Sequence, residues 1–437
     1  MTSLYANPIQ TREQGSTQTR NAAVSVDSIL MFLSAMAPLL QHYKGVFVNP
    51  SLAITSFIAI IALRRISMGK VRINIGYLGL LLYGIYAAFI HGVDLTYLLR
   101  EMVQVVVYLA VFNGMFDIGK LLRYARMIAV CATVMIILQY ICYYILGFHL
   151  QLVAIPLLSS STAQWHGLIR TGLIGVTGVR LHFYRPSAFF LEPSHFAIFC
   201  TPSIVTTLFS RTGDEKRERQ LALFISLGVL LSTSGMGIGV VVLCWGIYLA
   251  FFYGQKGQAR TIQLRKLLTR RTITLMILFL VALVGLYFGV PVFRQSVRRI
   301  FVTSGTMTAI EGRTTTGRRS LRMLTGIRKF IGFGDIYDIS NWNMAAFFFV
   351  TFRFGWIGTA IFYSFYIYSL FHLKREAQMM TLIFLLLSFF TVHMFGAYYK
   401  MFYTMIILYG YTQNRWEQTG SGPDPVETPA ARSSSAY

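Results

Sequence analysis

The sequence from Leu221 to Tyr253 reads LALFISLGVLLSTSGMGIGVVVLCWGIYLAFFY and contains no charged side chain. As one helix it would be about 50 Å long, which exceeds the roughly 30 Å thickness of a bilayer core. Small polar residues interrupt the stretch at Ser232-Thr233-Ser234-Gly235, where the chain can turn. We therefore predict two membrane spans in this stretch, the first of them short.

The rest of the chain has the same apolar character. Of its 437 residues, 55% are hydrophobic and only 13% are charged, whereas soluble domains contain roughly 25% charged residues. This composition excludes an ordinary cytosolic enzyme, a disordered protein and a disulfide scaffold. Apolar stretches fall at 27–43, 46–63, 73–91, 95–116, 127–147, 187–209, 221–233, 235–253, 272–290, 345–371, 379–395 and 398–413. The sequence therefore predicts an all-α, polytopic membrane bundle of about twelve transmembrane helices.

Positive charge orients this bundle. Lys and Arg number 39 against 16 Asp and Glu, a formal net charge of +23, and cytoplasmic loops of membrane proteins are rich in these cations. With the N-terminus inside, every short loop on the cytoplasmic side is basic: 64–72, 120–126, 211–219, 256–271 and 372–375. A single span over 221–253 would move the basic 256–271 loop outside. We expect a polar cytoplasmic tail over 1–26, a transmembrane domain over 27–413 and a disordered cytoplasmic tail over 414–437.

Two long loops remain on the outer side, over 148–186 and 291–344. Both are rich in arginine and poor in acid; the arginines are Arg170, Arg180 and Arg185, then Arg294, Arg298, Arg299, Arg313, Arg318, Arg319, Arg322 and Arg328. The guanidinium fork matches phosphate and carboxylate groups. We infer an external anionic ligand, either a diphosphate or an acidic sugar. The alternative is a solvated basic loop or a contact with outer-leaflet lipid.

Charged residues inside predicted spans are rare, and such residues are commonly functional. Arg353 lies about eight residues into its span, hence roughly 12 Å below the outer surface if the helix is continuous. Arg100 and Glu101 lie just inside the outer end of another span. Each of the three either contributes to function or belongs to a buried ion pair that holds the bundle together.

The segment from Arg185 to Ala197, RPSAFFLEPSHFA, places a cation, a carboxylate and an imidazole at the outer mouth of one helix. Pro193 suits a first helical turn, because its missing N–H and fixed φ are tolerated there. Glu192 would then lie near the positive end of the helix, which favours the carboxylate form. Two roles are open for Glu192: a general base for a sugar hydroxyl, or a helix cap, with His195 bonded to backbone.

This segment resembles the R-x-S-x-F-F-x-E-P-S-x-F-A signature of the Wzy-type O-antigen and exopolysaccharide polymerases. Three further stretches are similar to the family pattern in the same order. They are the polar break at 231–237, the external Gly317-Arg318-Arg319 with Gly332-Phe333-Gly334 downstream, and Asn341-Trp342-Asn343 followed by Phe354-Gly355-Trp356-Ile357-Gly358. The motifs cover roughly 180–360, and the pattern of spans covers the whole chain. In the family's second loop an arginine precedes a G-x-G, and here fifteen residues separate Arg318 from Gly334.

The resemblance implies a GT-C-like membrane glycosyltransferase of the bacterial inner membrane that needs neither metal nor cofactor. Its substrates would be undecaprenyl-diphosphate-linked oligosaccharides at the periplasmic face, with membrane lipids, a chain-length regulator and a flippase as candidate partners and no nucleic acid. By matched position, Arg185 and Arg318 would contact the diphosphate. Glu192 would be the base, with His195 and Asp335 as alternates. The remaining substrate-binding candidates are Arg180, Arg319, Arg322, Arg353 and Asn343.

Two other functions compete with this interpretation. O-antigen ligases share the architecture, but they usually carry a histidine before the asparagine at the last membrane re-entry, where this chain has Trp342 before Asn343. A transporter or lipid-glycan flippase would also fit twelve spans, although we find no internal repeat of the kind such proteins show. The four cysteines form no CxxC and no Cys/His cluster, so the sequence predicts no metal site.

Overall fold

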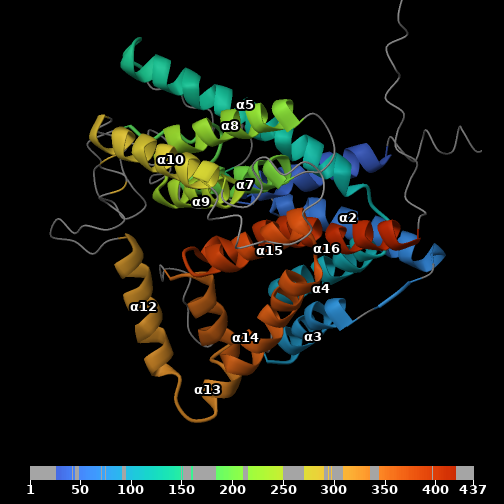
Figure 1. Cartoon of the computed structure of the whole chain (residues 1–437). Helices are drawn as coiled ribbons and strands as arrows, with labels where there is room; N and C mark the ends of the chain where they lie inside the picture. The colour runs from blue at the N-terminus through green and yellow to red at the C-terminus, as the bar shows by residue number, and fades with distance from the viewer. Residues whose placement is uncertain are drawn as a thin grey trace, which may run out of the picture.

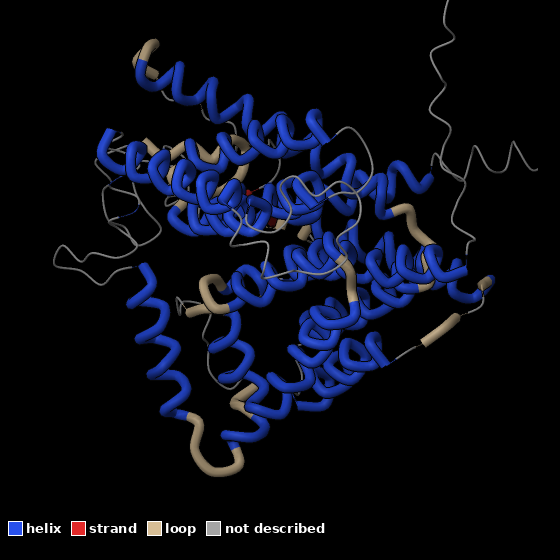
Figure 2. The backbone as a smooth tube through the Cα atoms, viewed as in Figure 1, coloured by secondary structure: helices blue, strands red, loops and turns tan. Residues whose placement is uncertain are grey.

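The computed structural model describes residues 26–41, 43–44, 49–69, 71–73, 75–90, 95–148, 150, 159–160, 184–209, 215–249, 270–289, 294, 297, 309–334, 344–395 and 397–419. Within these residues the fold is all-helical (Figures 1 and 2), apart from one short antiparallel pairing. In that pairing β1 (Tyr43–Lys44) lies beside β2 (Ser159–Ser160). The prediction of an all-α fold is therefore confirmed for the described part of the chain.

Each of the twelve predicted apolar stretches contains a helix. The helices are Val26–Leu40, α2 (Pro50–Met68), α3 (Ile75–Ile90), α4 (Leu95–Phe112), α5 (Ile118–Tyr144), α7 (Pro193–Phe209), α8 (Glu215–Leu231), α9 (Gly235–Ile247), α10 (Arg270–Gly289), α14 (Ala346–His372), α15 (Arg375–Ser388) and α16 (Ala397–Thr419). Among the described residues, three of these, α2, α5 and α14, are long and apolar enough by length and composition to cross a membrane, although α14 is interrupted at Gly355. The chain therefore has the character of a membrane protein, and the count of twelve spans stays a prediction.

The predicted break between 221–233 and 235–253 is confirmed. α8 ends at Leu231, Thr233 adopts a left-handed φ of 54°, and the Ser234 side chain accepts a hydrogen bond from Gly237 N at the start of α9. The indole Nε1 of Trp245 donates to Ser226 Oγ at 3.0 Å. Since Ser226 precedes the turn and Trp245 follows it, α9 folds back along α8.

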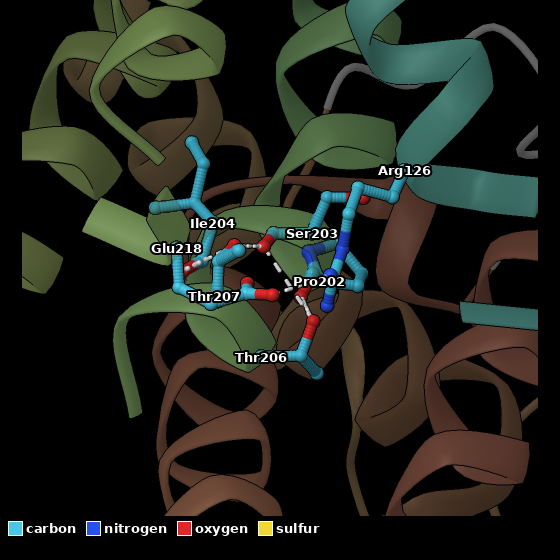
Figure 3. Close-up of polar contacts among 7 residues, drawn as sticks. All are labelled: Arg126, Pro202, Ser203, Ile204, Thr206, Thr207 and Glu218. Atoms are coloured by element: carbon cyan, nitrogen blue, oxygen red, sulfur yellow. Dashed lines mark hydrogen bonds and ion pairs between the residues drawn. The ribbon is translucent and has the colours of Figure 1, made fainter. Parts of the chain in front are cut away.

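α7 is the central helix of the bundle, with nearly every residue buried and contacts to α5, α8, α9, α15 and α16. Pro202 lies in its interior and has no N–H to offer the Ile198 carbonyl. Tyr403 Oη of α16 donates to that carbonyl at 2.7 Å instead. The turns that follow are closed by side chains, since Thr206 Oγ1 donates to Pro202 O and Thr207 Oγ1 to Ser203 O (Figure 3).

α14 is not one continuous span, which corrects the predicted helix over 345–371. Gly355 has φ 66° and ψ −174°, so the helix breaks there. Thr351 and Thr359 hydroxyls lie 3.1 Å apart, and the rings of Phe347 and Tyr363 are 6.0 Å apart. In a straight helix these pairs would be separated by about 12 and 24 Å of axial rise. The two halves of α14 therefore fold back on one another at an acute angle (Figure 1).

Backbone N–H groups of a neighbouring turn bond to the carbonyls at the helix break. α13 (Arg328–Ile331) leads into Gly332-Phe333-Gly334, and the N–H groups of Phe333 and Gly334 donate to the carbonyls of Phe352 and Arg353 at 3.0 and 2.8 Å. Tyr86 Oη of α3 donates to the next carbonyl, that of Phe354, at 3.0 Å. Carbonyls released by the break are thus satisfied, as an apolar setting requires.

Basic segments gather at one end of the bundle. Arg65 forms an ion pair with Asp27, and Arg72 N donates to Asn113 Oδ1 at 2.8 Å. Arg126 pairs with Glu218 at 3.1 Å beside the second half of α7 (Figure 3). Since α7 begins at Pro193 and this pair lies beside its second half, Glu192 and the Arg126–Glu218 pair lie towards opposite ends of α7.

Candidate functional site at the start of α7

The segment before α7 is a compact turn anchored by aromatic rings. Tyr184 is buried, and its ring stacks on that of Tyr143 at 4.4 Å. Burial raises the pKa of the Tyr184 phenol to about 12, so this group stays neutral near pH 7. Ser187 Oγ donates to Phe190 O at 2.8 Å, while Phe190 N donates back to Ser187 O at 2.9 Å. The turn fixes the path of the chain between Arg185 and Glu192.

Glu192 lies at the first turn of α7. Its backbone carbonyl accepts from His195 N and Phe196 N at 3.1 and 3.2 Å, so it begins the helix. Its carboxylate is half-buried, and Oε2 accepts from Ser194 Oγ at 2.9 Å. A carboxylate here is stabilised by the positive end of the helix macrodipole. The backbone of Glu192 therefore begins the helix and its carboxylate lies at the helix end, while the role of general base stays a prediction.

His195 is buried and faces another histidine. Its Nε2 lies 3.1 Å from Nε2 of His393, which belongs to the short 3-10 helix η3 (Val392–Met394) between α15 and α16. A hydrogen bond between two imidazoles requires that one donate and the other accept, so at least one ring of the pair is neutral. Tyr399 Oη of α16 donates to the His195 carbonyl at 3.1 Å. The expectation of backbone bonding by the His195 ring is therefore replaced by a ring-to-ring contact.

A fully buried ion pair lies on the neighbouring helices. Lys400 Nζ of α16 contacts both carboxylate oxygens of Glu101 of α4 at 2.7 Å, and both side chains are nearly inaccessible to solvent. The ammonium also lies over the rings of Tyr83 and Phe395, at 5.6 and 5.5 Å from their centroids. The ion-pair interpretation of Glu101 is confirmed. Lys400, its partner, was not identified by the sequence analysis.

A row of exposed arginines lies on a separate helix, α12 (Ala309–Met323). Arg318, Arg319 and Arg322 are exposed, whereas Gly317 and Ser320 on the opposite face are buried. A Cβ at Gly317 would lie 2.3 Å from the ring of Phe348 on α14, so α12 packs tightly against the first half of α14. We call Arg318, Arg319 and Arg322 the arginine row.

The structure groups the predicted site residues into two sets. Arg185, Glu192 and His195 share one segment, whereas the arginine row and Arg353 belong to the region of α12 and the first half of α14. The sets are connected through Ala346 N, which donates to Thr391 O at 3.0 Å, two residues before His393. Arg353 lies over the ring of Phe349 at 5.7 Å, just before the helix break. Arg180, Asp335 and Asn343 lie outside the described residues.

Sequence reasoning placed His393 and His195 near the same face but did not pair them, and it missed Lys400 as the partner of Glu101. His393 is 198 residues from His195, and Lys400 is 299 residues from Glu101. The only local signal for Lys400 is that a lysine lies near the start of an apolar stretch. The sequence around His393 holds no such signal. In the described part of the chain, no group of three or more His, Cys, Asp or Glu side chains is arranged to hold a metal ion.

Comparison with protein-family models, with curated proteins and with solved structures finds no match to this chain. Function is therefore argued from the site itself.

Proposed function

We propose that this protein is a polysaccharide polymerase. It transfers a growing glycan from undecaprenyl diphosphate onto the terminal hydroxyl of another lipid-linked repeat unit at the periplasmic face of the inner membrane. The product class is O-antigen, capsule or exopolysaccharide. The observation that carries the proposal is the Glu192 carboxylate, which lies at the start of the buried helix α7 on the same short segment as Arg185.

Glu192 acts as the general base. As the acceptor hydroxyl attacks the anomeric carbon, its proton passes to the carboxylate and the bond from that carbon to the diphosphate oxygen breaks. Ser194, bonded to Glu192 Oε2 at 2.9 Å, orients the carboxylate. His195 is less suited to this role, because its Nε2 is engaged with His393 and its side chain is buried.

Arginines bind the leaving group. The diphosphate gains charge as the glycosidic bond breaks, and fixed guanidinium groups stabilise that charge. Arg185 belongs to the Glu192 segment, the arginine row belongs to α12, and Arg353 lies just before the break in α14, over the ring of Phe349. We propose that these three groups of guanidinium side chains share the diphosphate. Since the activated bond is already present in the lipid diphosphate, the reaction needs no nucleotide and no metal.

The proposal includes a membrane arrangement. The chain crosses the membrane twelve times in a GT-C-like bundle with both termini cytoplasmic, and the Glu192 end faces the periplasm. Support comes from the helix in each apolar stretch and from Arg126, which pairs with Glu218 beside the second half of α7, away from Glu192. Lipid-linked oligosaccharides and membrane lipids are the direct partners. A flippase that supplies the substrate and a chain-length regulator complete the expected system.

The test uses purified protein in lipid nanodiscs with a lipid-diphosphate-linked repeat unit as donor and acceptor. Glu192→Gln removes the base while keeping the shape, and the transfer rate is expected to fall by about 10²- to 10⁴-fold. Glu218→Gln, which changes a carboxyl at the opposite end of the bundle, serves as the matched control and retains the rate. Transfer by Glu192→Gln at the wild-type rate would remove Glu192 from the mechanism.

A transporter is the second candidate, because of the buried Lys400–Glu101 pair. Ionisable pairs inside membrane bundles are typical of transport pathways. If the protein transports lipid-linked glycan, its loss leaves the precursor on the cytoplasmic face, and purified protein elongates nothing. The nanodisc assay therefore separates the two functions.

A further inference from the structure

Gln139 is a buried polar residue near the end of α5, with its side chain almost fully shielded from solvent. Its Oε1 accepts from Ala188 N at 2.9 Å. Its Nε2 donates to the carbonyls of Leu150 and Ala188 at 3.1 and 3.3 Å. Both N–H donors and the carbonyl oxygen of the amide are thus engaged, which a side chain in an apolar setting requires.

These three bonds join the two ends of the long outer loop predicted over 148–186. Leu150 lies just after the chain leaves α5, and Ala188 lies just before the chain enters α7. One amide holds both positions against the end of α5. Gln139 therefore holds Leu150, where the chain leaves α5, and Ala188, where it approaches α7, at one position on α5.

Ala188 has an unusual backbone conformation. Its φ of 53° lies in the left-handed region, which disfavours residues other than glycine, aspartate and asparagine. Such a conformation persists only where the surroundings enforce it. Gln139 pairs with both the N–H and the carbonyl of Ala188, as a neighbouring strand would, and so enforces this conformation from outside the segment.

We infer that Gln139 is a positioning residue for the proposed transferase site. Ala188 lies three residues after Arg185 and four before Glu192, so its conformation determines how the guanidinium and the carboxylate face one another. Gln139 acts through the Ala188 backbone and touches no substrate. This inference rests on the proposed function and adds to it a residue of α5, which the sequence pattern does not single out.

The experiment compares Gln139→Leu with the wild type and with Thr133→Val. Leucine keeps the apolar volume but leaves one N–H and two carbonyls without their partner. Thr133 is a buried residue of the same helix whose hydroxyl donates only to Ala129 O within α5, so its replacement is the matched control. Two quantities are measured in nanodiscs: hydrogen exchange of the peptide that contains Ala188, and the kcat and KM of transfer.

Gln139→Leu is expected to speed exchange at Ala188 by about tenfold, because the amide loses its acceptor. It is expected to lower kcat by about 10- to 100-fold with little change in KM, because the reacting groups are misplaced while the binding groups remain. Thr133→Val should change neither quantity.

Unchanged exchange at Ala188 would overturn the positioning contact, and faster exchange with an unchanged kcat would overturn its link to the reaction. If wild-type protein transfers nothing, the proposed function fails. The exchange of Ala188 then still decides whether Gln139 orders the segment.

Discussion

The start of α7 and the arginine row of α12 show two opposite ways of carrying polar groups in a membrane protein. At α7, His195 and the nearby Lys400–Glu101 pair are buried and bonded to groups of the protein itself. On α12, Arg318, Arg319 and Arg322 are exposed, while only the opposite face of the helix packs on α14.

We infer from this difference that the buried polar groups near α7 stabilise the fold, whereas the arginine row on α12 binds a ligand. Buried charges lose water and need protein partners, so their removal is expected to affect folding. Exposed guanidinium groups keep their water and are free to bind a phosphate, so their removal is expected to affect function alone. Substitutions in the two regions are therefore expected to differ in their effect on stability, from more than about 3 kcal/mol at a buried contact to less than about 0.5 kcal/mol in the arginine row.

The glycine contact between α13 and α14 is the most sensitive point of the scaffold. A Cβ at Gly355 would lie 2.1 Å from the Phe330 carbonyl oxygen, and Gly355 already has a φ of 66°. Gly355→Ala should therefore destabilise the protein by more than about 3 kcal/mol. Thermal unfolding in nanodiscs measures this. Gly285→Ala in α10 is the control, because a Cβ there meets nothing within 4 Å. Equal midpoints for the two variants would contradict the tight contact.

Breaking the Lys400–Glu101 pair is expected to cause the next large loss of stability. Lys400→Met leaves Glu101 charged and buried without its partner, which typically costs about 3–5 kcal/mol. In the double variant Glu101→Gln, Lys400→Met no unpaired charge remains, so part of the lost stability should return. Chemical unfolding of both variants measures the difference. A single variant as stable as the double one would show that the pair does not contribute to the scaffold as proposed.

Tyr403 tests a single buried hydrogen bond. Tyr403→Phe leaves the Ile198 carbonyl without the donor that Pro202 cannot supply, and the expected loss is about 1–3 kcal/mol. Tyr287→Phe in α10 serves as the control, with an expected change below about 0.5 kcal/mol. The same unfolding assay reports both. If Tyr287→Phe lost as much stability as Tyr403→Phe, the loss could not be assigned to the unsatisfied Ile198 carbonyl.

The arginine row is expected to have the smallest effect on stability and a large one on activity. Replacing Arg318, Arg319 and Arg322 together by Ala should change the free energy of unfolding by less than about 0.5 kcal/mol. Transfer should nevertheless be abolished, and Arg318→Ala alone should abolish polymer while the protein remains inserted. Chemical unfolding measures the stability, and the nanodisc assay on the same preparation measures the transfer rate. A large loss of stability would assign these arginines to the scaffold and break the comparison.

Local sequence signals predicted the helices well. Apolar stretches located twelve of the helices, whereas α12 and α13 lie within the predicted 291–344 loop and were not predicted. The small polar cluster at Ser232–Gly235 located the turn between α8 and α9. The break at Gly355 was missed, because a glycine within an apolar run is also common inside continuous membrane helices. Its cause lies in another segment, the turn at Gly332-Phe333-Gly334.

The candidate site was predicted only where it is local. Arg185, Glu192 and His195 follow one another in the chain, so one segment revealed them. His393, Lys400 and Gln139 reach the region from other parts of the chain, and the sequence around each does not indicate which residue it contacts. Contacts between helices depend on how the bundle packs, which hydropathy and spacing do not determine.

The most direct test of the proposed function is a gel of surface glycans, stained for polysaccharide, from a strain that lacks this protein and carries either the wild-type chain or Glu192→Gln. We predict a full ladder with the wild type. With Glu192→Gln the ladder should collapse to one repeat unit, or polymer should vanish while the one-unit lipid-linked precursor persists. Long polymer that accumulates on the lipid carrier without reaching its acceptor would instead identify a ligase, and an unchanged ladder would contradict the polymerase.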